Sequence, residues 1–207
     1  MRATLSPHLL LVAGGYGLGA ALYSALPDAA PLGRPMAAFL LPTAAAVTYA
    51  LLRALYTRHP VGSASSHAVS TYDAVMLRFI LFLMGVHATV LLGLLGILWG
   101  RSWAPRVVPV LLGLTMIGIG NLLPRTRPNL AIGIRTARTL ADEAVWAQTH
   151  RIAGYAVVAL GIVVLVAGIA IPPPLGPGMI LLAAPAGALG IPALLFWSRR
   201  HADGLHP

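Results

Sequence analysis

The chain has 207 residues, of which 58% are hydrophobic and only 9% are charged. A soluble domain carries about 25% charged residues, so the composition excludes an ordinary soluble domain. Cysteine is absent, which excludes disulfides, zinc–thiolate sites and cysteine nucleophiles. The net charge is +9, and all 14 basic residues are arginines.

Six apolar runs follow one another along the chain. Each approaches the roughly 20 apolar residues that a membrane-spanning helix needs. The first run has only a weakly basic start and is rich in glycine, so we expect a retained helix and not a cleaved signal peptide. The expected fold class is all-α, a polytopic bundle of six transmembrane helices forming a single integral membrane domain over 1–207. The predicted helices are 9–26, 36–56, 74–98, 107–123, 152–171 and 179–197.

The arginines indicate an orientation, because short cytoplasmic loops carry the excess of basic residues. With the N-terminus inside, eleven arginines fall on inner segments and three, Arg34, Arg101 and Arg106, on outer ones. We therefore expect both termini to face the cytoplasm. The inner segments include a polar loop at 57–73 and the longest loop at 124–151.

Several polar residues fall within or beside the apolar runs, Arg78, His87 and Asn121 among them. Arg78 should extend toward the inner face, where its charge meets water. His87 should be neutral and hydrogen bonded across a helix, or else serve a proton relay or a ligand. Asn121, near the end of the fourth run, should be buried and bonded to a neighbouring helix or to the loop.

The first half of the 124–151 loop is expected to be irregular. Pro124 and Pro128 both disfavour helix. Asn129 favours a turn because its side chain bonds its own backbone, and Gly133 permits a positive φ.

The second half of the loop should be helical. Thr139 is the predicted N-cap, with Asp142 in the capping-box position, and the helix can run from Asp142 into the fifth apolar run. Glu143, Trp146 and His150 then share one helix face. The loop arginines could line a charged pocket that grips carboxylates or phosphates, or they could hold anionic headgroups and set topology. The spacing of Glu143 and His150 is not specific for a metal, so we expect neither a metal nor a cofactor.

Residues 120–154 hold a spaced set of short elements. They are Gly120-Asn121, Pro124, Arg127-Pro128-Asn129, Gly133-Ile134-Arg135-Thr136, Thr139-Leu140, Glu143, Val145-Trp146, Thr149-His150-Arg151 and Gly154. This set resembles the SdpI family of bacterial membrane proteins. One departure is Ala137-Arg138, where the family commonly has Pro-Trp.

The resemblance implies a multi-pass protein of the bacterial cytoplasmic membrane. The family includes an immunity protein that protects against a secreted killing peptide and signals by holding a transcriptional repressor at the membrane. It therefore implies immunity or signalling through a peptide, lipid or cytoplasmic partner, without direct nucleic acid binding. The residues it implicates in binding are Asn121, Arg127, Asn129, Arg135, Thr136, Glu143, Trp146, His150 and Arg151.

Two other functions remain open. One is a membrane enzyme acting on a lipid or prenylated substrate, with terpene-cyclase-like protonation by Asp142 or Glu143 and His150 as acid–base partner. Aromatic rings would then stabilise a carbocation; the candidates are Tyr72, Trp146, Tyr155 and Trp197. The other is a transporter or channel, which the lack of an intramembrane acid opposite Arg78 and His87 makes the least favoured.

Overall fold

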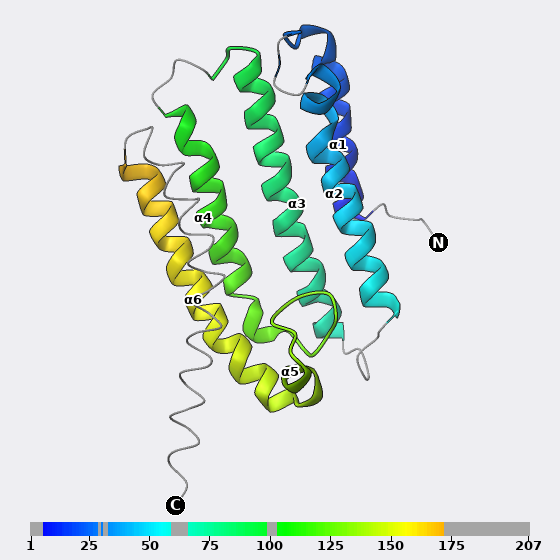
Figure 1. Cartoon of the computed structure of the whole chain (residues 1–207), viewed down its shortest axis with the longest axis vertical. Coiled ribbons are helices and arrows are strands. Elements are labelled where there is room, and N and C mark those ends of the chain that lie inside the picture. The colour runs from blue at the N-terminus through cyan, green and yellow to red at the C-terminus, as the bar shows by residue number, and fades with distance from the viewer. Residues whose placement is uncertain (1–5, 29, 31–32, 59–65, 99–102, 172–207) are drawn as a thin grey trace, which may run out of the picture.

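The structure is a computed structural model that describes residues 6–28, 30, 33–58, 66–98 and 103–171. All regular structure in these residues is helical, which confirms the predicted all-α fold. The sixth predicted helix, 179–197, lies outside the described residues, as does Trp197. The helices run alternately up and down, with the loop between α4 and α6 at one end (Figure 1).

Five of the described helical segments are long and apolar enough to cross a membrane. The predicted orientation, with both termini inside, stays a prediction, as does the single domain over 1–207. The helices are α1 (Pro7–Leu22), α2 (Gly33–Arg58), α3 (Ser66–Leu94), α4 (Val107–Gly120), α5 (Ala137–Ala141) and α6 (Glu143–Ala170).

Several helices begin outside the apolar runs that predicted them. α3 begins at Ser66 and not at 74, so the second half of the predicted inner loop is helical. α6 begins at Glu143, before the apolar run at 152, which confirms the prediction that the helix runs from Asp142 into that run. Hydropathy marks only the apolar part of a helix, and polar residues extend the same hydrogen-bonding pattern beyond it. α4 instead ends early, at Gly120, before the short 3-10 turn at Leu123–Arg125.

α4 and α6 pack against each other with their backbones in close approach (Figure 1). A Cβ atom added to Gly113 would lie 2.8 Å from the carbonyl oxygen of Gly161, and one added to Gly120 would lie 2.9 Å from that of Gly154. The two glycines of each helix are seven residues apart, so they recur on one face. Small residues in this pattern allow two membrane helices to pack backbone against backbone.

α1, α2 and α3 form the other half of the bundle. The ring of His87 in α3 donates from Nε2 to the carbonyl oxygen of Gly15 in α1, at 3.2 Å. This confirms the predicted bond across a helix. Arg78 donates from Nη1 to the carbonyl oxygen of Ala74, one turn closer to the end of α3 at which the loop lies. The side chain therefore extends toward the end of the bundle that carries the loop; that this end is the inner face stays a prediction.

Large apolar side chains cover the outside of the bundle. On α6, Val163, Val166 and Ile169 are each more than half exposed. A water-soluble bundle would turn such residues inward, whereas lipid tails accept them. The exterior therefore agrees with the composition in indicating a membrane protein.

Candidate functional site

The loop between α4 and α6 is a folded unit, which we call the loop cap (121–142). It packs on two aromatic side chains from the first turns of α6, Trp146 and His150, which are completely buried. Their rings stack with centroids 3.9 Å apart and planes 14° apart. The start of α6 thus provides a rigid platform under the loop cap.

His150 binds main-chain atoms on both of its ring nitrogens. Nδ1 donates to the carbonyl oxygen of Trp146 at 2.9 Å, and Nε2 accepts from the main-chain N–H of Ile134 at 3.0 Å. Because a carbonyl only accepts and an amide N–H only donates, these partners fix a neutral ring with its proton on Nδ1. Gly133 has a φ of +111°, as predicted, and a Cβ there would collide with His150 Nε2.

Trp146 fixes the other side of the loop cap. Its Nε1 donates to the carbonyl oxygen of Thr126 at 3.0 Å, and the hydroxyl oxygen of Thr126 lies 3.2 Å from the same Nε1. The two rings therefore hold the loop near residues 126 and 134. In both contacts, the loop atoms that bond to the ring include main-chain atoms, the Ile134 N–H for His150 and the Thr126 carbonyl for Trp146.

Asn129 forms the predicted turn. Its Oδ1 accepts from the amides of Ala131 and Ile132, and its Nδ2 donates to the carbonyl oxygen of Arg127. The side chain is buried, and these bonds occupy its polar atoms. Ala131, two residues further on, packs against Tyr72 of α3 and links the loop cap to the other half of the bundle.

The helical part of the loop cap begins elsewhere than predicted. Thr136 is the N-cap of α5 and forms a capping box with Thr139, so the prediction of Thr139 as the N-cap is wrong. Asp142 has an extended backbone, ends α5 and caps α6, accepting on Oδ1 from the amides of Ala144 and Val145. Three hydroxyl and carboxyl side chains compete here to cap a helix, and local pattern alone does not choose between them.

The charged groups of the loop cap lie on its surface. Arg127 pairs with Glu143, and both side chains are 59% exposed. Arg135 donates to the carbonyl oxygen of Leu130. Asn121 is also exposed, so its predicted burial is wrong. It is the C-cap of α4, the residue at which this helix ends. The other exposed arginines between Asn121 and the first turns of α6 are Arg125, Arg138 and Arg151.

The residues predicted to bind thus separate into two groups. Asn129, Trp146 and His150 are buried and hold the loop cap in shape. Thr136 is exposed, and it also holds the shape of the loop cap, because it caps α5. The residues available to a partner at the surface are Asn121, Arg127, Arg135, Glu143 and Arg151. Whether either group takes part in binding stays a prediction.

The aromatic rings of the cyclase alternative lie in different surroundings. Trp146 is enclosed beneath the loop cap, Tyr72 stacks on Tyr56 with centroids 4.3 Å apart, and Tyr155 is 70% exposed. Among the described residues, no three His, Cys, Asp or Glu side chains are grouped so that they could hold a metal ion.

Sequence reasoning missed a pocket at the same end of the bundle. It lies between the beginning of α1, the last turns of α2 and the early turns of α3, and it has a volume of about 520 Å³. Its charged residues are Arg53 and Asp73, and Asp73 was assigned to a loop and not to a helix. The only signal in the sequence was that Arg53 lies near the end of one apolar run and Asp73 directly before the next.

These observations define the class of the molecule. It is an all-helical protein of the multi-span membrane type, with a folded, arginine-bearing loop cap closing one end of its helices.

The model of the SdpI/YfhL protein family matches residues 125–196 of the chain. The match covers most of the loop cap and α6, and it confirms the predicted SdpI resemblance over this segment. No curated protein and no solved structure matches the chain.

Proposed function

We propose that the chain is a binding and signalling protein of the bacterial cytoplasmic membrane, of the toxin-immunity type. Its loop cap is the recognition surface. It binds an anionic or polar group presented by a peptide, a lipid or a cytoplasmic partner. The similarity of residues 125–196 to the SdpI/YfhL family supports this class of function.

The observation that carries the proposal is that buried side chains hold the shape of the loop cap, while its charged side chains remain at the surface. The buried side chains of Asn129, Trp146 and His150 all bond to main chain of the loop or its platform. The loop therefore has one fixed shape before any partner arrives. A fixed surface loses little conformational entropy on binding, which is the condition for specific recognition.

The exposed charges determine the chemistry of the partner. Arg127 and Arg135 project from the loop cap, and arginine forks hold carboxylates and phosphates through paired hydrogen bonds. Glu143 holds Arg127 in place by an ion pair at the surface. An acidic segment of a protein or an anionic lipid headgroup would complement this surface.

The enzymatic alternative gains no support from the same geometry. The carboxylate of Asp142 accepts two amide hydrogen bonds as a helix cap, Glu143 is paired with Arg127, and His150 has both ring nitrogens bonded to main chain. A general acid must reach its substrate, and His150 is covered by the loop cap.

The test is protection of living cells. The full chain is expressed in a sensitive bacterial strain, which is challenged with a panel of secreted membrane-active peptides. We expect protection from at least one peptide and its loss in Arg127→Ala and in Arg135→Ala, with unchanged amounts of protein in the membrane. Arg34→Ala, at the opposite end of the bundle, is the control and should protect as the wild type does.

Unchanged protection in both loop variants would contradict the proposal. Turnover of a prenylated substrate by the purified protein, lost in Asp142→Asn or Glu143→Gln, would replace it with the enzymatic function.

A further inference from the structure

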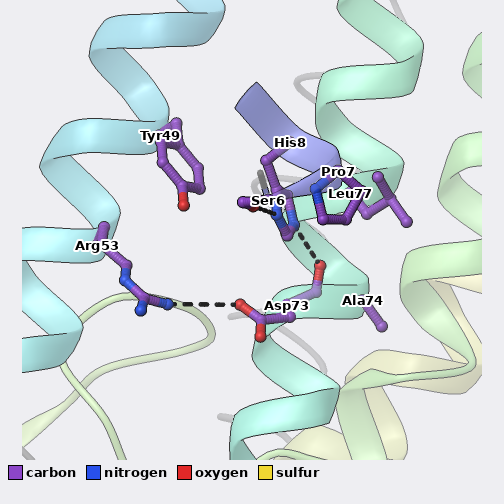
Figure 2. Close-up of a pocket in the computed structure, with 8 residues that line it drawn as sticks. All are labelled: Ser6, Pro7, His8, Tyr49, Arg53, Asp73, Ala74 and Leu77. Atoms are coloured by element: carbon purple, nitrogen blue, oxygen red, sulfur yellow. Dashed lines mark hydrogen bonds and ion pairs between the residues drawn. The ribbon is translucent and has the colours of Figure 1, made fainter. Parts of the chain in front are cut away.

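The pocket between α1, α2 and α3 is separate from the surface of the loop cap that the proposed function uses. Figure 2 shows its lining residues, which come from the beginning of α1, from α2 and from α3, with Arg53 and Asp73 directed toward each other. Its lining combines polar residues with apolar ones: Ser6, Pro7, His8, Tyr49, Arg53, Asp73, Ala74 and Leu77.

His8 forms a fixed wall of this pocket. Its Nε2 donates to the carbonyl oxygen of Asp73 at 3.0 Å, and its Nδ1 accepts from the Ser6 hydroxyl at 2.8 Å. The ring stacks on Tyr49, with centroids 5.3 Å apart. These contacts hold the beginning of α1 against α3 and keep the pocket in one shape.

Two opposite charges flank the space. Arg53 Nη1 and Asp73 Oδ1 are 3.8 Å apart, and the side chains are 50% and 41% exposed. An N–H···O hydrogen bond spans about 2.7–3.2 Å, so this contact is an ion pair longer than a hydrogen bond. The pocket thus offers a cationic and an anionic group side by side, with no net charge (Figure 2).

The pocket lies at the ends of the candidate membrane spans. These spans begin at Pro7 and Thr71 and end at Tyr56, each within a turn or so of a pocket residue. The polar half of the lining is therefore at the level where lipid headgroups meet the acyl chains. Its apolar half, Pro7, Ala74 and Leu77, continues along the helices into the span.

We propose that this pocket binds the headgroup of a zwitterionic phospholipid that carries a phosphate beside a primary ammonium. Arg53 contacts the phosphate and Asp73 contacts the ammonium, while the first acyl carbons lie along Leu77. This proposal does not rest on the function proposed for the loop cap.

The charge pattern selects among headgroups. A purely anionic headgroup places its charge beside Asp73, which repels it. A quaternary ammonium has no N–H to donate to the Asp73 carboxylate, whereas a primary ammonium has three. The pocket should therefore prefer phosphatidylethanolamine to both phosphatidylglycerol and phosphatidylcholine.

The test is lipid retention by the purified full chain in detergent, measured by native mass spectrometry. The three lipids are added in turn at equal concentrations. We expect phosphatidylethanolamine to be retained in preference to the other two. Asp73→Asn should lower its affinity about tenfold, because a hydrogen bond to a charged group is replaced by one to a neutral amide. The carbonyl of Asp73 that receives His8 is unchanged in this variant.

Asp28→Asn is the matched control. Asp28 also pairs with an arginine, Arg34, at 3.0 Å, but at the opposite end of the bundle. Its replacement should leave retention unchanged. Leu77→Trp keeps both pocket charges and adds bulk to the apolar part of the lining, where the first acyl carbons would lie, so it should lower lipid retention without altering net charge.

Equal retention of phosphatidylethanolamine and phosphatidylcholine by the wild type would overturn the proposal. An equal loss in Asp73→Asn and Asp28→Asn would do the same, as would full retention in Leu77→Trp. Free phosphoethanolamine has the same two charges without acyl chains. If it bound as tightly as the lipid, the assignment to a membrane lipid would be overturned.

Discussion

The two halves of this bundle, α4 with the loop cap and α6, and α1 with α2 and α3, are held together by partly different contacts. In the half made of α4, the loop cap and α6, glycines bring two backbones together, and buried rings bond to main-chain atoms. The half made of α1, α2 and α3 also has such contacts, since His8 and His87 bond to main-chain carbonyls and Gly19 brings α1 close to the backbone of α2. It differs in that aromatic side chains also stack on one another and an open pocket remains between the helices. The first half holds a loop in place, whereas the second surrounds a pocket.

This difference has consequences for substitutions. A contact with main chain depends on backbone position, which a neighbouring side chain cannot easily restore. A contact between side chains can be rearranged by rotamer changes. We therefore expect substitutions that disturb main-chain contacts to cost more stability than those that disturb exposed side-chain pairs, from the largest effect to the smallest as follows.

Gly133→Ala should be the most damaging of the four changes. The alanine must adopt a φ of +111°, and its Cβ collides with the ring of His150. We expect a loss of about 3 kcal/mol in the free energy of unfolding, from backbone strain together with overpacking. The measurement is unfolding of the purified protein in detergent.

Gly96→Ala is the control for that change. Gly96 also has a positive φ, of +74°, but a Cβ there meets nothing within 4 Å. It should lose only about 1 kcal/mol, for the strained backbone alone. Equal losses in the two variants would show that the contact with His150 contributes nothing.

Gly113→Ala should lose about 2 kcal/mol, because a well-packed interface must shift to admit a methyl group. Its Cβ would lie 2.7 Å from the main-chain nitrogen of Leu165 in α6. Gly17→Ala in α1 is the control, since a Cβ at Gly17 meets nothing within 4 Å. Thermal unfolding should separate the two, and an unchanged Gly113→Ala variant would disprove close packing of α4 on α6.

Trp146→Phe should lose about 1–2 kcal/mol, because the carbonyl of Thr126 is left in a buried site without its indole donor. Hydrogen exchange should also become faster at the amides of the loop cap. Trp103→Phe is the control, since Trp103 is 47% exposed. Loop amides that stay equally protected would show that the indole bond does not hold the loop.

Glu143→Gln should have the smallest effect on stability, below about 1 kcal/mol. Both members of the Arg127–Glu143 pair are 59% exposed, and exposed ion pairs contribute little because water and salt screen them. The same unfolding experiment measures it. A loss as large as that of Gly133→Ala would mean that this pair, and not the buried rings, fixes the loop cap.

The local features of the loop cap could be predicted from sequence. Pro124 and Asn129 act within a few residues of themselves, and Gly133 acts through its own φ, so sequence patterns indicate them directly. The N-cap could not be chosen, because Thr136, Thr139 and Asp142 each fit a capping pattern. Patterns of this kind indicate that a helix begins nearby, but not at which residue.

Features that depend on residues far apart in the chain could not be predicted from the sequence. The partner of His150 is an amide 16 residues away, and nothing in the sequence of Ile134 marks it. The pocket joins residues of three helices, and Asp73 belonged to a predicted loop. Such pairings exist only after the helices have packed.

The rings of His150 and Trp146 hold the loop cap through its main chain, at the Ile134 N–H and mainly at the Thr126 carbonyl. The shape of the loop cap therefore depends on other atoms than those displayed at its surface. The side chains that face outward, Arg127, Arg135 and Arg138 among them, are not the atoms that His150 and Trp146 recognise. Replacement of Arg127 or Arg138 would leave these two ring contacts in place while changing what the loop cap displays, whereas replacement of Arg135 would also remove its bond to the Leu130 carbonyl. A protein built in this way can acquire a new partner by a few surface substitutions, as an antibody framework does with its variable loops.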